Sequence, residues 1–234
     1  MPRSSEAAPS SGAVATPATP AFPVSAPSAR SRVRRLPDRA HYDFDTIAAI
    51  IDSAWACHLA FSWQGTVHAL ATAHWRIGRH LYLHGARASR MLQALAEGEA
   101  CVTVTHIDGL VLARSAFHHS MNYRSVVAYG RFEAVDAPAL KLDALRALIE
   151  RIAPGRWDAL RPATAKELAA TTVLRLALDE ATAKIRNGGV KDDEADLDWP
   201  VWAGVVPLQL VPGMPATDPA SRVATPPAGL PGAG

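Results

Sequence analysis

Short apolar segments separated by turn residues run through the middle of this chain, and they constrain its fold more than any other feature. Residues 56–63 and 67–75 flank the turn dipeptide Gln64-Gly65, and a second turn at 77–79 precedes a third segment at residues 80–84. Tight turns join antiparallel neighbours, whereas parallel strands need a longer crossover. The order of the segments therefore favours an antiparallel barrel over a doubly wound sheet.

Further strands are predicted in the second half of the chain. Residues 100–105 alternate between apolar and polar as a half-buried strand does, and Asp108-Gly109 is a hairpin signal. Longer segments at 124–135, 172–183 and 201–211 also have strand character. With six or seven strands and few long connections, the class predicted is mainly β, in which helices are inserted into an antiparallel barrel.

Three or four helices are predicted from capping residues and apolar periodicity. Asp43 or Asp45 can cap a helix through Ile51, and a second helix covers residues 89–96. Pro138 falls in the first turn of a third helix, whose apolar stripe ends near residue 152. A fourth, short helix begins at Thr164, which forms a capping box with Glu167.

Composition divides the 234 residues into a domain and two tails. Residues 1–33 are rich in Ala, Pro and Ser and end in a basic cluster, and residues 212–234 are rich in Pro, Gly and Ala. Such segments bury too little apolar surface to offset the entropy of ordering, so both are predicted to be disordered. One folded domain is predicted over residues 34–211.

Charge and hydropathy narrow the partners and the location. The net charge is +2, which gives no strong attraction to nucleic acid. No apolar stretch approaches the roughly 18 residues of a membrane span. We therefore expect no nucleic-acid or membrane partner and a cytoplasmic protein. The two cysteines and the scattered histidines lack the spacing of metal ligands, so no metal site is predicted.

A dense polar cluster occupies residues 118–125, between two apolar strands. It contains two histidines, an amide, a phenol, a guanidinium and two hydroxyls. In an extended chain, His118, Asn122 and Arg124 share one face, and His119, Tyr123 and Ser125 share the other. Polar donors are costly to bury without partners. The cluster therefore predicts a site for a polar or anionic ligand.

Other segments carry chemistry suited to phosphate or to a flat ring. Ser89 and Arg90 begin a predicted helix just after a strand that ends at His84, and helix N-termini bind anions. Lys184 and Arg186 share one strand face and form a second cationic patch. Trp202 can lie against a flat ring. No phosphate-binding glycine loop and no nucleophile elbow is present, which leaves ATPase and hydrolase functions unsupported.

Together these segments resemble the pyridoxamine 5′-phosphate oxidase-like, FMN-binding split-barrel family, and most of all its flavin-nucleotide-binding, nitroimidazole-reductase-like branch. The resemblance spans roughly residues 34–210. Its most specific part is the run from Ala113 to Val126, and weaker matches lie at 81–91, 102–111, 154–157, 184–186 and 201–207. The family often has prolines on the strand that covers the flavin ring, where this chain has residues 66–72.

The resemblance implies a split β-barrel that dimerises and binds FMN in two equivalent clefts between subunits. It implies that Ser89 and Arg90 hold the phosphate, and that later residues approach from the same or the other subunit. His118 and His119 are predicted as proton donors. The predicted cofactor contacts are His84, Ser89, Arg90, Met91, Thr103, Thr105, Asn122, Tyr123, Arg124, Ser125, Lys184, Arg186 and Trp202.

The function predicted is that of an FMN-dependent oxidoreductase that passes electrons or hydride to a small organic acceptor. In such proteins the flavin supplies the redox chemistry, and the protein supplies orientation and electrostatics. Vitamin B6 chemistry is not predicted, because the pyridoxal-phosphate-binding part of the true oxidases has no match. Two alternatives stay open: a haem-binding or haem-degrading split barrel, and a flavin-binding module without turnover.

Overall fold

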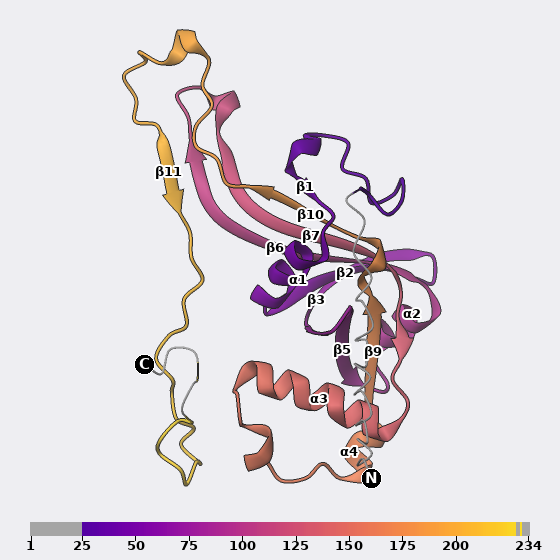
Figure 1. Ribbon diagram of the computed structural model, residues 1–234. Coiled ribbons are helices and arrows are strands. Elements are labelled where there is room, and N and C mark those ends of the chain that lie inside the picture. The colour runs from indigo at the N-terminus through magenta and orange to yellow at the C-terminus, as the bar shows by residue number, and fades with distance from the viewer. Residues whose placement is uncertain (1–24, 228–229, 231–234) are drawn as a thin grey trace, which may run out of the picture.

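Two antiparallel sheets form the body of the protein, as the computed structural model shows for residues 25–227 and 230 (Figure 1). The larger sheet has seven strands in the order β1-β10-β7-β6-β2-β3, and β11 pairs with β6 beside this path. Its strands are β1 (Ala40–His41), β2 (Ala56–Trp63), β3 (Thr66–Ala73), β6 (Glu99–Leu112), β7 (Ser120–Arg131), β10 (Ala181–Arg186) and β11 (Gly204–Pro207).

The smaller sheet has the order β4-β5-β9-β8. Its strands are β4 (Trp75–Ile77), β5 (His80–Ala86), β8 (Glu133–Ala134) and β9 (Thr171–Ala177). The chain passes between the sheets at His74, at Phe132 and at residues 178–180, where His74, Phe132 and Leu178 are buried. The sheets do not close into one continuous barrel. This architecture confirms the predicted split-barrel class.

Four α-helices complete the body, as predicted: α1 (Phe44–Ser53), α2 (Arg90–Glu97), α3 (Pro138–Ile152) and α4 (Ala165–Ala170). Asp43 caps α1 by accepting from the Thr46 N–H at 2.8 Å, and Thr164 and Glu167 form the predicted capping box. The main core lies between the sheets and α1 and α2. A second cluster, centred on Trp75, Tyr82 and Leu148, joins the smaller sheet to α3.

Two predicted turns are present with the expected geometry. Gln64 and Gly65 both have positive φ, of 48° and 77°, and they join the paired residues Trp63 and Thr66. This is the conformation of a two-residue hairpin turn, in which the backbone twist matches that of the strands. Gly78, with φ of 55°, turns the chain between β4 and β5.

Asp108-Gly109 is not a hairpin turn, and this prediction was wrong. Strand β6 continues through both residues with a bulge between Ile107 and Gly109. The glycine serves a different purpose, because a Cβ there would lie 3.1 Å from Val205 Cγ1 and 3.1 Å from the Val206 carbonyl oxygen. Gly109 therefore permits β11 to pack closely against β6. The real connection to β7 contains the one-turn helix η2 (Ala116–His118).

Three other strand predictions need new bounds. Residues 172–183 form parts of β9 and β10, which belong to different sheets, because η4 (Leu178–Glu180) buries Leu178 and redirects the chain. Residues 67–75 likewise belong to both β3 and β4, and residues 124–135 belong to both β7 and β8. Of residues 201–211, only β11 is a strand.

The two terminal segments differ in how they contact the body of the protein. Residues 1–24 lie outside the described residues, but Arg30, within the predicted N-terminal tail, forms ion pairs with Glu99 at 2.6 Å and Glu180 at 2.9 Å. Residues 208–227 contain no helix or strand. We call residues 199–214 the C-terminal arm; it runs beside β6 and then past the body (Figure 1). No helix in the described part of the chain is long and apolar enough to cross a membrane.

Candidate functional site

The N-terminus of α2 lies beside a small cavity of about 260 Å³. Ser89 is the cap residue, whose Oγ accepts from the Leu92 N–H at 3.4 Å. Arg90 is exposed and forms no ion pair with any described residue. The first N–H groups of a helix and an unpaired guanidinium suit a phosphate. Ser89, Arg90 and Met91 line this cavity together with Phe61, Trp63, His68 and Leu70.

The opposite wall of this cavity is the free edge of the larger sheet. Strand β3 is the last strand of the sheet, and most of its side chains are exposed on both faces. Val67 is 75% exposed, and His68 stacks on Phe61 with ring centroids 5.5 Å apart. An unpaired edge strand offers free backbone N–H and C=O groups to a ligand or to another chain.

The predicted polar cluster extends along the hairpin of β6 and β7. His118 lies in η2, with Nδ1 3.8 Å from Asp192 and Nε2 3.9 Å from Asp193. Asp192 is held by Arg114 at 2.9 Å. His119 contacts the Ser115 carbonyl oxygen through Nδ1 at 3.0 Å. Both proposed proton donors thus lie at the tip of the hairpin, away from Ser89 and Arg90.

The hairpin tip also gathers possible metal ligands that the spacing of the sequence did not indicate. One atom each from His118, Asp193 and Asp196 lies within 4.8 Å of the others. The side chain of Asp193 is 80% exposed. Water can solvate exposed carboxylates without a bound metal ion. The three side chains by themselves therefore indicate a solvated polar cluster.

The cationic residues of the later strands are engaged by the protein itself. Arg186 is buried and donates to Asn122 Oδ1. It also donates to the carbonyl oxygens of Gly188 and Gly189, in both cases at 2.9 Å. Lys184 donates to the Arg35 carbonyl oxygen at 3.1 Å. Arg186 therefore fixes the chain after β10, a role that its position in the sequence did not reveal.

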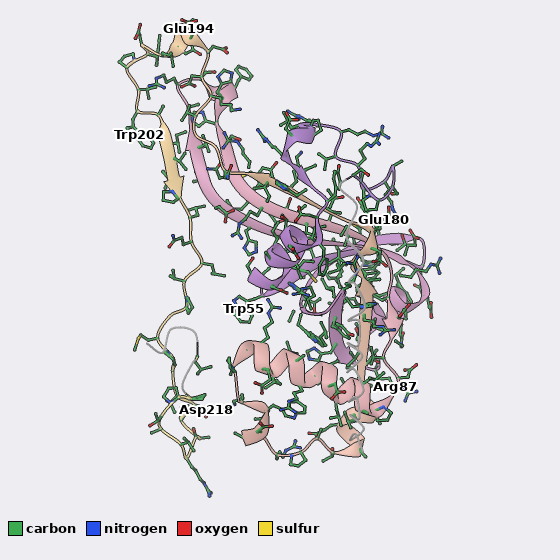
Figure 2. The ribbon with its side chains drawn as sticks, in the orientation of Figure 1. Trp55, Arg87, Glu180, Glu194, Trp202 and Asp218 are labelled. Atoms are coloured by element: carbon green, nitrogen blue, oxygen red, sulfur yellow. The ribbon has the colours of Figure 1, made fainter. Side chains whose placement is uncertain are left out.

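A second pair of predicted residues faces a large open cavity between the hairpin and the C-terminal arm. Thr105 and Arg124 line this cavity of about 940 Å³, and Trp55 and Leu208 contribute apolar walls. Arg124 forms a bidentate pair with Asp108, at 2.9 and 2.8 Å, and these hydrogen bonds lower the pKa of Asp108. Figure 2 shows Trp55 extending from the body on the side where the arm runs.

Three further predicted residues lie nearby on the sheet. Thr103 is on β6, where it pairs with His58 and with Val127. Tyr123 is on β7 opposite Ile107, and the Ser125 hydroxyl donates to the Lys184 carbonyl oxygen at 3.3 Å. These residues place hydroxyl groups along the middle of the sheet without forming a pocket of their own.

His84 faces a different cavity, of about 860 Å³, beneath α3. Its apolar lining consists of Leu142, Leu145, Leu148, Ile149, Trp157 and Leu160, and its polar rim includes Asp158, Arg161 and Glu167. Burial lowers the pKa of His84, and its Nδ1 is buried without a hydrogen-bond partner. The apolar residues follow His84 by about 60 to 75 positions in the chain, so no local pattern could predict their contact.

Trp202 lines none of these three cavities and precedes β11, whose Gly204 pairs with Leu112 of the hairpin. It is 63% exposed on the C-terminal arm, where its ring covers Gly204. In Figure 2, Trp202 and Arg87 lie at opposite ends of the molecule, and Arg87 immediately precedes the α2 cavity. The predicted cofactor contacts therefore divide, within one chain, among the α2 cavity, the hairpin with its neighbouring strands, the His84 cavity and the arm.

Comparisons with known proteins agree with this architecture. The family model described as pyridoxamine 5′-phosphate oxidase matches residues 43–185. The flavocytochrome Anf3 from Azotobacter vinelandii is 40% identical, with a TM-score of 0.83, over 86% of this chain and 94% of its own. An FAD- and haem-binding protein from Mycobacterium smegmatis is 38% identical, with a TM-score of 0.79, over 83% of this chain and 98% of its own.

A more distant structure supports the fold alone. A proposed 5-nitroimidazole antibiotic resistance protein from Bacteroides thetaiotaomicron is 20% identical, with a TM-score of 0.53, over 62% of this chain and 86% of its own. No curated protein matches the chain.

Proposed function

Because this chain belongs to the pyridoxamine 5′-phosphate oxidase family, we propose that it is a redox protein that binds a flavin and haem. The observation that carries the proposal is the likeness, over most of both chains, to a flavocytochrome and to an FAD- and haem-binding protein. Two separate cavities, one at the N-terminus of α2 and one beneath α3, give this chain room for two different groups.

The flavin belongs at the α2 cavity. Ser89, the first N–H groups of α2 and the unpaired Arg90 suit the phosphate next to the ribityl chain. Phe61, Trp63 and the exposed edge of β3 offer an apolar wall for the flat ring. The same phosphate occurs in FMN and FAD, so these residues suit both; the FAD-binding relative favours FAD over the FMN predicted from the sequence.

A second copy of the chain completes this site in our proposal. The α2 cavity of about 260 Å³ is smaller than the roughly 300–1,000 Å³ of typical cofactor pockets. The edge of β3 is unpaired, and the C-terminal arm leaves Leu210 86% and Met214 85% exposed. Exposed apolar segments of this kind mark protein interfaces. Trp202 and Lys184 of one copy can then reach the flavin of the other, as a homodimer requires.

The flavin supplies electron or hydride transfer when it is bound, and the residues of this chain bind and orient it. His118 and His119 can deliver a proton to that site only if the hairpin tip of one copy reaches the cavity of the other. A small organic acceptor, approaching the exposed β3 edge, remains the proposed substrate. The alternative of a flavin-binding module without turnover predicts that no nicotinamide donor reduces the bound flavin.

The test is the cofactor content of the purified protein. We expect a flavin band in the blue, a Soret band, and FAD in the mass spectrum of the released cofactor. Arg90→Ala should weaken flavin retention by about 10- to 100-fold, because a charge-assisted hydrogen bond is worth about 1.5–3 kcal/mol. Arg87→Ala is the matched control and should retain the flavin, because Arg87 is also exposed and lies three residues before Arg90 but does not line the cavity.

Three results would contradict the proposal in different parts. Colourless protein that takes up neither added flavin nor haem would refute the whole proposal. Equal flavin loss in the Arg87 and Arg90 variants would refute the phosphate site at α2. A protein that sediments as a monomer with full flavin occupancy would refute the role of the second copy.

A further inference from the structure

We propose that the cavity beneath α3 is the haem site and that His84 is the ligand to the iron. This inference rests on the proposed function, because only the redox role with haem gives the cavity its occupant. It goes further by assigning the site and its ligand in this chain. The shape of the cavity, the position of the His84 imidazole in its lining and the charge at the rim each support it.

The cavity has the size and lining of a cofactor pocket. Its volume of about 860 Å³ lies within the roughly 300–1,000 Å³ typical of such pockets. Leu142, Leu145 and Ile149 come from one face of α3, and Trp157 and Leu160 come from the segment that follows. An apolar lining of this extent suits the porphyrin plane, which is large, flat and largely apolar.

His84 supplies the imidazole in the lining of this cavity, and its ring packs against Trp75 with ring centroids 5.6 Å apart. An imidazole nitrogen is a common ligand of iron. His84 Nδ1 is buried and has no hydrogen-bond partner. An unpartnered buried polar group costs about 1–3 kcal/mol, and such groups call for an explanation such as a bound group that the ring serves.

His84 is the one nitrogen or sulfur ligand of the kind that binds haem iron in the lining of this cavity. All residues that line this cavity belong to the described part of the chain, and among them only His84 carries an imidazole, thiol, thioether or amine. A single histidine is a common way to hold haem iron on one side. The ligand of the iron can therefore be tested by changing one residue.

The rim supplies a cation for the two carboxylates of haem. Arg161 is exposed at the mouth of the cavity and donates to both oxygens of Glu167 and to the Pro162 carbonyl oxygen. These bonds use three of the five N–H groups of the guanidinium, so two remain for a carboxylate of haem. Arg161 is joined to the rigid capping box of α4, which fixes the position of the charge.

The test compares His84→Gly with His80→Ala, purified with haem added during expression. His80 is the matched control, because it lies on the same face of β5 and is also partly desolvated, but it does not line the cavity. We expect His84→Gly to lose at least about tenfold in haem retention, since even second-shell changes cost 10- to 100-fold. Added imidazole should restore a Soret band like that of the wild type, and His80→Ala should resemble the wild type throughout.

Flavin content and circular dichroism, measured on the same samples, separate a lost ligand from a lost fold. If His84→Gly fails to fold, Leu145→Trp fills the cavity while it retains His84, and it should exclude haem but keep the flavin. A His84→Gly protein with wild-type haem content and an unchanged Soret band overturns the inference and leaves the proposed function intact. Wild-type protein that binds flavin but takes up no haem overturns the inference together with the haem half of the proposed function.

Discussion

The indole of Trp75 lies edge-to-face against the imidazole of His84, with ring centroids 5.6 Å apart and planes inclined by 62°. Trp75 is 1% exposed and also stacks on Tyr82 at 5.8 Å. Such aromatic contacts favour particular ring geometries. Trp75 therefore packs against the His84 ring and restricts its orientation.

Replacing Trp75 tests how its ring and its N–H group contribute. Trp75 Nε1 is buried without a hydrogen-bond partner, which costs about 1–3 kcal/mol. Trp75→Phe removes this group but also loses packing volume, so we expect the free energy of unfolding to change by less than about 1.5 kcal/mol. Trp75→Ala should cost about 3–5 kcal/mol. Chemical denaturation measures both, and an equal loss in the two variants would contradict the role of the N–H group.

Arg151 attaches α3 to the rest of the body. It donates to the carbonyl oxygens of His74 at 2.5 Å, Asp52 at 2.9 Å and Ala54. Arg151→Met leaves two acceptors at the end of α1 and a third between β3 and β4 without their partner, so the free energy of unfolding should fall by about 2–4 kcal/mol. Arg146→Met is the control: its exposed ion pair with Asp158 should contribute less than about 1 kcal/mol. Urea denaturation that ranks Arg146 above Arg151 would refute this assignment.

Arg186 and Arg90 should separate stability from cofactor binding. Arg186→Met leaves Asn122 and two carbonyl oxygens without their buried donor, so unfolding should become easier by about 2–4 kcal/mol in the protein without flavin. Arg90 is exposed, so Arg90→Ala should leave that stability unchanged within about 0.5 kcal/mol. Thermal melts of the flavin-free proteins measure both changes. A larger loss of stability in the Arg90 variant than in the Arg186 variant would contradict the structural role given to Arg186.

Acid should destabilise the fold through His74. Desolvation by burial, aided by the charge of Arg151, lowers the pKa of His74, although its contact with the Ile51 carbonyl oxygen opposes the shift. Below about pH 6.5 the unfolded chain takes up a proton that the folded chain refuses, so stability falls as pH falls and is level above that value. The slope is at most about 1.4 kcal/mol per pH unit for this group.

The variant His74→Gln tests the origin of this dependence. It keeps an N–H donor for Ile51 but does not titrate, so its stability should vary less with pH between 7.5 and 5.5, values that lie about 1 unit either side of the reference pKa of histidine. His58→Gln, on the exposed face of β2, should keep the wild-type slope. Identical slopes in all three proteins would show that other groups cause the acid sensitivity.

Gly130 is required where β7 crosses the smaller sheet. Its φ is 154°, and a Cβ there would lie 2.9 Å from Leu176 Cδ1. Gly130→Ala combines backbone strain with a steric overlap and should cost about 1–3 kcal/mol. Gly188→Ala meets no atom within 4 Å and should change stability by less than about 0.5 kcal/mol. The midpoint of chemical denaturation measures both, and equal midpoints would contradict this account.

Local patterns in the chain determined the elements themselves. The capping box at Thr164, the serine cap at Ser89 and the Gln64-Gly65 turn are all formed as predicted, because each depends on residues within a few positions of one another. The strand order joined by tight turns likewise indicated an antiparallel barrel, and the resemblance to a known family implied its split form. The start of α2 at Ser89 and Arg90 is also a local feature, whereas the phosphate site predicted there stays a prediction.

Tertiary contacts decided the rest, and they could not be read from local spacing. Gly109 was predicted to be a turn residue, but it allows β11 to pack closely against β6. Arg186 was predicted to be part of a cationic patch for a ligand, but it donates to the Asn122 side chain and to two carbonyl oxygens of its own chain. His84 is half-buried, with an unpartnered Nδ1, only because α3 folds over it from far along the chain. Burial and desolvation depend on residues distant in sequence. The sequence alone therefore determined which groups are present, and the packing of α3 and the sheets decided which of them are desolvated and which line a cavity.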